Sequence, residues 1–287
     1  MSKINISDID FSKKIGSGAF GHVYPYKLKG NKSGIESVVK HIVINSVSDL
    51  IVKLSEVVIG YSCNHPGVIS ILSYLIVHKP AKPTEPEKFE LFIRMPKMKE
   101  SLSQHIYNSK NKKEDKNRLL KQIYTLVCGL EYLHGRKIVH RDIKPGNILV
   151  DQEGNVVLAD IGSANCILEE NHSEALSAFV TTKEYLPPEF SNNSIPRKKK
   201  LFYPADVWSL GLSLVQLCLM KNIPAMSKFD REEQIKEISK HYGDDLGEIF
   251  QGMLDINPDK RKTIAQVREE LKTKFPFLVN KKEYKLI

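Results

Sequence analysis

The pattern of hydrophobic and polar positions changes about one third of the way along the chain. Up to about residue 97 the apolar residues form short runs between glycine, proline and polar turns, which predicts strands. These runs are 15–26, 37–44 and 89–95. From about residue 98 the apolar residues recur at helical spacing instead. The pattern therefore predicts a β-rich first part and a mainly helical second part.

One helix is expected inside the β-rich part, over residues 48–63, where Ser48 or Asp49 can cap the first turn. Its apolar residues recur at helical spacing: Leu50, Leu54, Val57, Val58 and Tyr61. The Pro-rich stretch 79–88 is polar and is interpreted as a connection between two strands.

The second part is expected to contain four helices, with short strands and turns over 139–159 between the first helix and the second. The helical segments are 119–133, which Gly135 ends, then 207–220, 246–254 and 263–272. Residues 207–220 are apolar almost all round, which predicts a helix buried on every side. The apolar run 210–220 is too short to span a bilayer and contains Gln216.

Composition narrows the class of protein only slightly. The net charge of +9 over 287 residues fits either a Lys-rich solvated surface or an acidic partner. Four widely spaced cysteines without a CxxC pair argue against a zinc site or a disulfide framework, and favour an intracellular setting, cytoplasmic or nuclear. The first residues lack the apolar core of a signal peptide.

A glycine-rich segment, GSGAFGHV, occupies residues 16–23. Glycines allow a backbone to approach phosphates and to present N–H groups to them. A GxGxxG pattern is also typical of dinucleotide-binding folds, which need a helix to open at the third glycine. Here Pro25 and the apolar residues after Gly21 predict a strand, so a nucleotide phosphate loop between strands is the favoured interpretation.

A lysine and a glutamate are candidates to hold the nucleotide phosphates. Lys40 follows Val38 and Val39 in a β-branched run, and a strand lysine can contact the α- and β-phosphates. A carboxylate is needed to fix its long side chain. Glu56, in the expected helix, is the natural partner.

The segment HRDIKPGN at 140–147, followed by Asp160, holds the candidate catalytic groups. Asp142 can accept the proton of an attacking hydroxyl, and Lys144 can offset charge on a transferred phosphoryl group. Asn147 and Asp160 offer the oxygen ligands that Mg²⁺ prefers. His140 is expected to pack and hydrogen-bond within the core.

Together these motifs resemble the eukaryotic-type protein kinase superfamily, over about residues 11–277. The resemblance extends to TKEYLPPE at 182–189, DVWSLG at 206–211 and NPDKR at 257–261. It implies an α+β, bilobal fold in one domain over 1–287, with a small antiparallel N-lobe carrying one helix (about 1–97), a larger helical C-lobe (about 98–277) and a short tail. It also implies that Arg261 pairs with Glu189.

The resemblance implies a protein kinase of the serine/threonine branch, since Lys144 and Thr182 follow that branch's pattern. ATP and Mg²⁺ are the implied cofactors, and proteins with Ser or Thr acceptors are the implied substrates. Asp142 and Lys144 would be catalytic, and Asn147 and Asp160 would bind metal. The nucleotide would be bound by Ile15, Gly16, Ser17, Gly18, Ala19, Phe20, Gly21, Val23, Val38, Lys40, Glu56, Met95 and Met98.

Several departures from the family pattern bear on activity. Ile161 replaces a phenylalanine and should still pack, Val38 replaces an alanine over the adenine, and Pro96 removes one backbone donor beside Met98. Gly60 replaces an apolar residue in the helix that carries Glu56, so activity can depend on an activating partner or on phosphorylation. Ser173, Ser177 and Thr181 are the candidate phosphorylation sites.

Alternative functions are distinguished by the same residues. A non-catalytic scaffold of this fold would be expected to lack part of the catalytic set, which is intact here. A small-molecule kinase would not need the segments at 182–189 and 257–261. The basic cluster 197–200 is interpreted as an exposed loop, a nuclear-localisation patch or a contact for acidic substrates. Neither a membrane nor a specific nucleic acid is expected as a partner.

Overall fold

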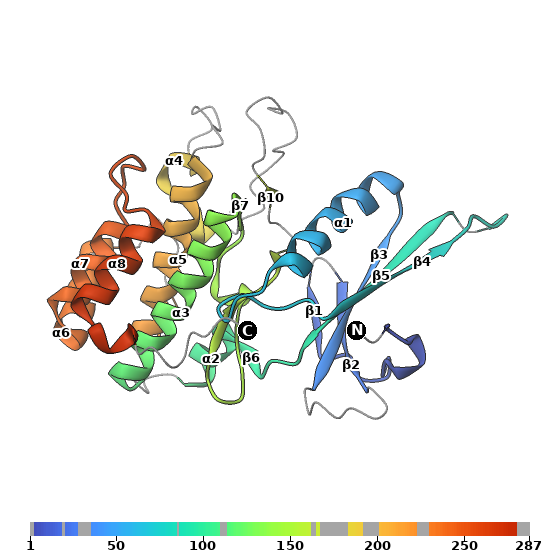
Figure 1. The fold of residues 1–287 in the computed structure, drawn as a ribbon, viewed down its shortest axis with the longest axis horizontal. Coiled ribbons are helices and arrows are strands. Elements are labelled where there is room, and N and C mark those ends of the chain that lie inside the picture. Colours follow the sequence, from blue (N-terminus) through green and yellow to red (C-terminus); the bar gives the residue numbers. More distant parts are fainter. Residues whose placement is uncertain are drawn as a thin grey trace. The chain divides into compact units, whose positions relative to one another are not determined.

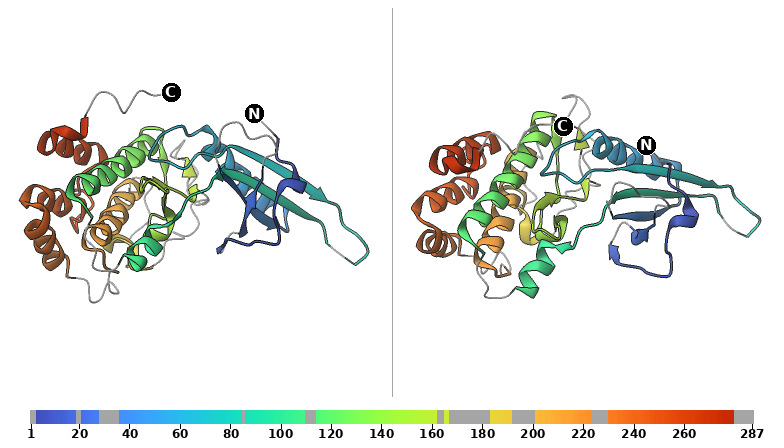
Figure 2. Two further views of the ribbon diagram at one scale, coloured as in Figure 1. Left: turned by 90° about the horizontal axis from the view of Figure 1, so that it is seen from below. Right: turned by 60° about the horizontal axis from the view of Figure 1, so that its bottom comes forward.

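A computed structural model of the chain describes residues 3–18, 21–27, 36–84, 86–109, 114–161, 165–166, 183–191, 201–222 and 230–279. The chain divides into two compact units, each described here by itself. The first unit is Met1–Asn64 with Ile69–Met98, and the second is His65–Val68 with Lys99–Ile287. Figures 1 and 2 trace both units from the N-terminus to the C-terminus.

The first unit is built on a five-stranded antiparallel sheet with strand order β1-β2-β3-β5-β4. The strands are β1 (Gly16–Gly18), β2 (Gly21–Tyr26), β3 (Ser37–Ile44), β4 (Ser73–Lys79) and β5 (Lys88–Pro96). The predicted runs 37–44 and 89–95 correspond to β3 and β5. The sequence prediction expected a strand before the 79–88 connection but gave no bounds for β4, because the half-buried residues of β4 lack a strict alternation. The β4–β5 hairpin extends beyond the other strands in both figures.

Alternating side chains of the central strands form a core on each face of this sheet. Val39 and Phe92 pack on one face with residues of the N-terminal segment. The opposite face carries Ile42, Leu91 and Ile93. The helix α1 (Val47–Ser62) covers that second face, because its buried Val57 packs into the same cluster. The period-two pattern of β3 and β5 therefore sets both cores.

The helix α1 begins earlier than its predicted caps suggest. The N-cap is Ser46, whose hydroxyl oxygen accepts the backbone N–H of Asp49 at 3.0 Å. The prediction of Ser48 or Asp49 as the cap was wrong. Asp49 lies in the first turn instead, where its charge favours the helix dipole.

The second unit is mainly helical. Its helices are α2 (Leu102–Asn108), α3 (Lys116–Gly135), α4 (Pro188–Ser191), α5 (Phe202–Leu219), α6 (Arg231–Tyr242), α7 (Asp244–Met253) and α8 (Ile264–Lys274). The short strands are β6 (Glu100–Ser101), β7 (Ile138–Val139), β8 (Ile148–Val150), β9 (Val156–Leu158) and β10 (Asn165–Cys166). The sequence prediction missed α2, which is short, and α6, which has few apolar residues.

The helix α5 lies in the interior of the second unit, where it packs against α3, α6 and α7 (Figure 1). It begins at Phe202, earlier than the predicted 207, and all its residues except Tyr203 and Pro204 are buried. By length and composition it could cross a membrane, but 89% of its apolar window is buried inside the fold. The prediction of a helix buried all round is confirmed over most of its length.

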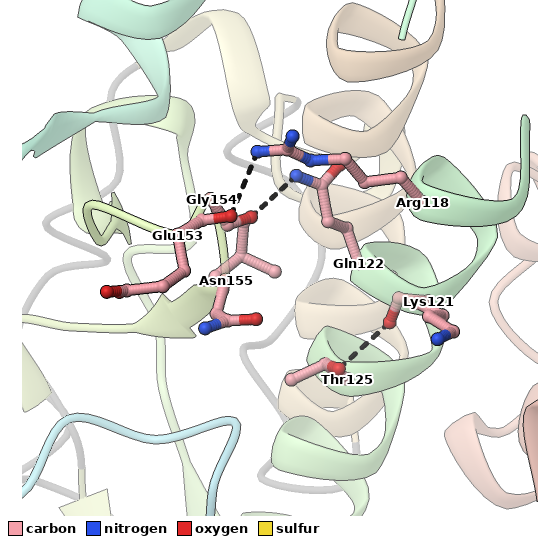
Figure 3. A pocket seen from close by; sticks show the side chains of 8 residues that line it. Arg118, Lys121, Gln122, Thr125, Glu153, Gly154 and Asn155 are labelled. Carbon is pink, nitrogen blue, oxygen red and sulfur yellow. Dashed lines mark hydrogen bonds between the residues drawn. The ribbon is translucent and has the colours of Figure 1, made fainter. Parts of the chain in front are cut away.

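The turn between β8 and β9 is held against α3 by two side chains (Figure 3). Gln122 donates from Nε2 to the carbonyl oxygen of Gly154 at 2.8 Å, and Arg118 donates from Nη2 to that of Glu153 at 3.1 Å. Gly154 has φ +82°, and a Cβ there would lie 1.6 Å from Arg118 Nη2. These contacts fix the hairpin that follows the 140–147 segment.

Candidate functional site

The 140–147 segment connects β7 to β8 and is held by a carboxylate from α5. Asp206, 1% exposed, accepts the backbone N–H of His140 at 2.7 Å and that of Arg141 at 2.8 Å. Arg141 has φ +70°, a left-handed conformation that is rare for this residue type. The two bonds to Asp206 stabilise this turn, so the segment leaves β7 in a fixed direction.

Asp142 is buried, 2% exposed, and is surrounded by donors. Asn147 donates from Nδ2 to Asp142 Oδ2 at 2.7 Å and to its backbone oxygen at 2.8 Å. The Lys144 ammonium lies 2.9 Å from the same Oδ2. A carboxylate that accepts from an amide and an ammonium is held in one orientation. Three predicted residues, two named as catalytic and one as a metal ligand, therefore meet in one cluster.

Asp160 lies next to this cluster because the preceding residue, Ala159, is hydrogen-bonded to the 140–147 segment. The Ala159 N–H donates to the Asn147 carbonyl oxygen at 2.8 Å, and the His140 ring nitrogen Nε2 lies 3.0 Å from the Ala159 carbonyl oxygen. Asp160 itself has φ +57°. His140 is fully buried, as predicted, and Ile161 is 5% exposed, so its apolar side chain packs in place of the family phenylalanine.

Asn147 and Asp160 can supply oxygen ligands to a divalent cation. Because the Asn147 amide nitrogen donates to Asp142, its Oδ1 is the atom that remains for a cation. Mg²⁺ takes few protein ligands and retains waters and phosphate oxygens. Among the described residues no group of three or more His, Cys, Asp or Glu could hold a metal ion. A two-ligand site completed by phosphates is compatible with both observations.

In the first unit, the predicted nucleotide residues Val23, Val38 and Lys40 lie on adjacent strands. Lys40 of β3 is opposite Val23 of β2 and Ile93 of β5, and Val38 is opposite Met95. Val38 is 6% exposed and contributes to the core. The sheet register thus places Val23 beside Lys40, which sequence spacing alone could not establish.

The glycine-rich segment forms the hairpin β1–β2. Gly16 pairs with Val23, and the Ile15 N–H donates to the Val23 carbonyl oxygen at 3.0 Å. Gly21 has φ +131°, and a Cβ there would lie 2.3 Å from the His41 carbonyl oxygen. Gly21 is therefore required by the backbone itself, besides any role toward phosphate. Ala19 and Phe20, and the side chain of Ser17, lie outside the described residues, and Gly18 is described through its backbone alone.

The remaining predicted nucleotide residues are placed only in part. Glu56 belongs to α1, but its side chain is outside the described part of the structure, so its pairing with Lys40 stays a prediction. Met95 lies near the end of β5 and packs against the core cluster on the sheet face covered by α1. Met98 follows β5 in the sequence and is half-buried. The roles predicted for all three stay predictions.

A buried ion pair joins two distant segments of the second unit. Arg261 donates to Glu189 through Nη1 and Nη2, and both side chains are at most 4% exposed. The predicted pairing is confirmed. Thr182 and the phosphorylation candidates Ser173, Ser177 and Thr181 lie outside the described residues, as does the basic cluster 197–200.

A pocket of about 170 Å³ lies between α3 and the β8–β9 turn (Figure 3). It is lined by Arg118, Lys121, Gln122, Thr125 and residues 153–156. None of the predicted site residues lines it, so it is separate from the Asp142 cluster.

At the level of sequence, Asp206 was given no role of its own and was named only as the first residue of the DVWSLG segment. The structure makes it the acceptor that holds His140 and Arg141, and His134 Nε2 lies 3.0 Å from its Oδ2. A signal was available, because a carboxylate entering a fully apolar helix must find partners if it is buried.

An antiparallel sheet with one helix, followed by a helical unit that holds the Asp142 cluster, defines the bilobal protein kinase class. Residues 9–271 match the family model described as the protein kinase domain. The chain belongs to the protein kinase domain family, within the superfamily of eukaryotic-type protein kinases.

Similar proteins carry serine/threonine kinase names. The chain is 28% identical to serine/threonine-protein kinase dst2 of Dictyostelium discoideum, with 94% of this chain and 23% of that protein covered. It is 28% identical to serine/threonine-protein kinase Nek5 of Mus musculus, covering 93% and 40%. Serine/threonine-protein kinase 10 of Danio rerio is 26% identical, covering 89% and 26%. The chain thus spans well under half the length of these relatives.

Proposed function

We propose that this chain is a serine/threonine protein kinase that transfers the γ-phosphoryl group of ATP to hydroxyl groups of protein substrates. The observation that carries the proposal is the Asp142 cluster, in which a buried carboxylate is held by Asn147 and Lys144. Family membership and the names of the relatives support protein Ser/Thr acceptors.

In this proposal Asp142 orients the acceptor hydroxyl and takes its proton as the hydroxyl oxygen bonds to the γ-phosphorus. The bond from that phosphorus to the oxygen shared with the β-phosphate breaks, and ADP leaves. Lys144 stands beside that carboxylate and offsets negative charge on the transferred group. Asn147 and Asp160 would hold Mg²⁺, which when bound neutralises charge on the phosphates. Arg141 would pair with a phosphate carried by Ser173, Ser177 or Thr181.

The first unit supplies the nucleotide-binding residues in this proposal. The β1–β2 hairpin from Ile15 to Val23 would present backbone N–H groups to phosphates, and Lys40, positioned by Glu56, would contact them. Val38, Met95 and Met98 would contact the base. The described cysteines Cys63, Cys128 and Cys218 are free thiols, which supports an intracellular location, cytoplasmic or nuclear.

The test is transfer of labelled γ-phosphate from Mg-ATP to casein, histone and the protein itself, followed by phosphoamino-acid analysis. Asp142→Asn keeps the size of the side chain and removes the proton acceptor, and we expect it to lower transfer by at least about a hundredfold. Asp245→Asn, at an exposed aspartate that pairs with Lys274, is the matched control and should keep full activity.

Each outcome of that assay distinguishes the proposal from a non-catalytic scaffold. Labelling of Ser or Thr by the wild type and loss in Asp142→Asn supports the kinase. If the wild type transfers nothing while ATP still raises its melting temperature, the chain binds nucleotide without turnover. An activating partner, or phosphorylation, would then be sought by repeating the assay in lysate with Asp142→Asn alongside.

A further inference from the structure

His105 stands between two carboxylates in the second unit. Its Nδ1 lies 3.0 Å from Glu100 Oε1, and its Nε2 lies 3.0 Å from Glu114 Oε1. The three side chains are only 11–14% exposed. Glu100 is in β6, His105 is in the last turn of α2, and Glu114 lies just before α3. One ring therefore joins three successive parts of the chain.

Both contacts can be hydrogen bonds only if the ring carries two protons. An ionised carboxylate accepts and cannot donate, and a neutral imidazole has one N–H. With the neutral ring, one nitrogen would face a carboxylate oxygen with its lone pair. The imidazolium ion donates to both glutamates, and each bond is then assisted by charge.

Cationic or amide donors surround both glutamates, and for Glu100 they favour the ionised form. Asn108 donates from Nδ2 to Glu100 Oε2 at 2.8 Å, and Lys99 Nζ lies 3.4 Å from Glu100 Oε1. Burial alone would raise the pKa of Glu100, but hydrogen bonds from His105 and Asn108 outweigh it and lower that pKa below its ordinary value of 4.5. On the other side, Arg118 Nε lies 3.5 Å from Glu114 Oε2.

One further titratable group, on another helix, interacts electrostatically with Glu114. Tyr242, at the end of α6, has its pKa raised to about 12, mainly by burial, with the charges of Cys218 and Glu114 adding to the effect. Tyr242 therefore stays neutral throughout the range in which histidine titrates.

We propose that the His105 imidazolium, bridging Glu100 and Glu114, is a pH-sensitive clasp that fastens α2 to the start of α3. As the pH rises and the ring loses a proton, one of the two bonds becomes a contact between a lone pair and a carboxylate. As the pH falls far enough to protonate Glu100, the other partner is lost. The clasp is closed between these limits.

Opening of the clasp can affect the candidate site, because α2 packs against elements of that site in the same unit. The helix α2 packs against β8 and against the short helix η2 (Pro145–Asn147), which contains Asn147. His105 is therefore a positioning residue for the segment that follows Lys144. The clasp itself does not depend on the proposed kinase activity, and its test uses structural measurements.

The protonation state of His105 can be read directly in the full chain. In ¹⁵N-labelled protein at about pH 7, long-range proton–nitrogen spectra distinguish an imidazolium ring from either neutral tautomer. The His105 signals are assigned by their loss in His105→Gln. Two protonated ring nitrogens are expected. A ring with a single proton at that pH overturns the proposal.

A second measurement uses wild-type protein and Glu114→Gln, so it does not require the His105 variant to fold. Protection of the α2 amides against hydrogen exchange is compared at about pH 6 and about pH 9. The wild type should lose about tenfold in protection at the higher pH, as expected for the loss of one charge-assisted bond. The side-chain amide introduced by Glu114→Gln can donate to a neutral ring, so in this variant the difference should disappear.

His78→Gln is the matched control, because exposed His78 also pairs with a carboxylate, that of Glu87, through Nε2 at 2.7 Å. This pair belongs to the first unit, so the substitution should leave the pH dependence of α2 protection unchanged. If Glu114→Gln keeps the wild-type pH dependence, or if His78→Gln removes it, the clasp does not exist as proposed.

Discussion

Arg261 and Glu189 are 72 residues apart in sequence and form two parallel hydrogen bonds, of 2.7 and 2.9 Å, in the interior of the second unit. The guanidinium also donates from Nη1 to the Pro204 carbonyl oxygen at 2.9 Å and stacks over Trp208 at 4.9 Å. The pair therefore ties α4 and the start of α5 to the loop before α8.

Removing one partner of this pair should destabilise the protein strongly. We expect Arg261→Ala to lower the free energy of unfolding by about 3–5 kcal/mol, because Glu189 is left charged and buried. Chemical denaturation monitored by circular dichroism gives the value. Arg268→Ala, at a more exposed arginine that pairs with Glu131, is the comparison and should lose less. If both variants lost the same free energy of unfolding, burial would not be the cause of the effect at Arg261.

Lys144 should affect turnover more than substrate affinity. We expect Lys144→Ala to lower kcat by about 10²–10³-fold with a small change in the KM for ATP, because the ammonium beside Asp142 acts on charge that develops during transfer. Steady-state kinetics at saturating ATP tests this, with a thermal melt to verify folding. Lys121→Ala removes an exposed lysine of the α3 pocket and should leave both constants unchanged. A large rise in KM alone would assign Lys144 to binding instead.

Two glycines should respond oppositely to alanine. In Gly154→Ala the alanine would have to adopt a left-handed φ, and its Cβ would displace Arg118 from its bond to Glu153. We therefore expect the free energy of unfolding to fall by about 1–2 kcal/mol. Gly135 ends α3 with no atom within 4 Å of an added Cβ. Gly135→Ala should therefore raise the free energy of unfolding by up to about 1 kcal/mol, because alanine lowers the conformational entropy of the unfolded chain. Urea titrations compare them, and a destabilised Gly135→Ala would show strain that the backbone does not indicate.

Cys128 should react slowly with alkylating agents in the folded protein. Burial raises the pKa of its thiol from 9.0 to about 11, so the reactive thiolate is scarce near neutral pH. The labelling rate of Cys128 with iodoacetamide should rise about tenfold per pH unit up to that value, as read by mass spectrometry of its peptide.

The same shift in pKa has a consequence for stability. Because the folded state holds this proton more tightly than the unfolded state, the contribution of Cys128 to stability is present below about pH 9 and is lost as the pH rises toward about 11. Cys128→Ser should remove this part of the pH dependence. Fast labelling of Cys128 at neutral pH would show that the pKa of this half-buried thiol is not raised.

The sequence alone determined the order of the main strands and helices, the candidate catalytic groups and the family resemblance. These features are local: β3 and β5 are dense apolar runs, and Asp142, Lys144 and Asn147 lie within six residues of one another. Their spacing limits what chemistry they can perform together. The short α2 and the polar α6 escaped prediction because their stability comes from packing against neighbours, which no local pattern records.

Only the tertiary structure decided which residues meet across long separations. Asp206 holds the turn at His140 and Arg141 from 65 residues away, and nothing in its local sequence specifies that partner. The position of Gly21 against the His41 carbonyl oxygen likewise depends on how two strands pair. The Glu100–His105–Glu114 clasp could likewise be found only in the folded structure. In the sequence a histidine and two glutamates in a polar stretch indicate solvated residues, and only folding places both carboxylates against one ring.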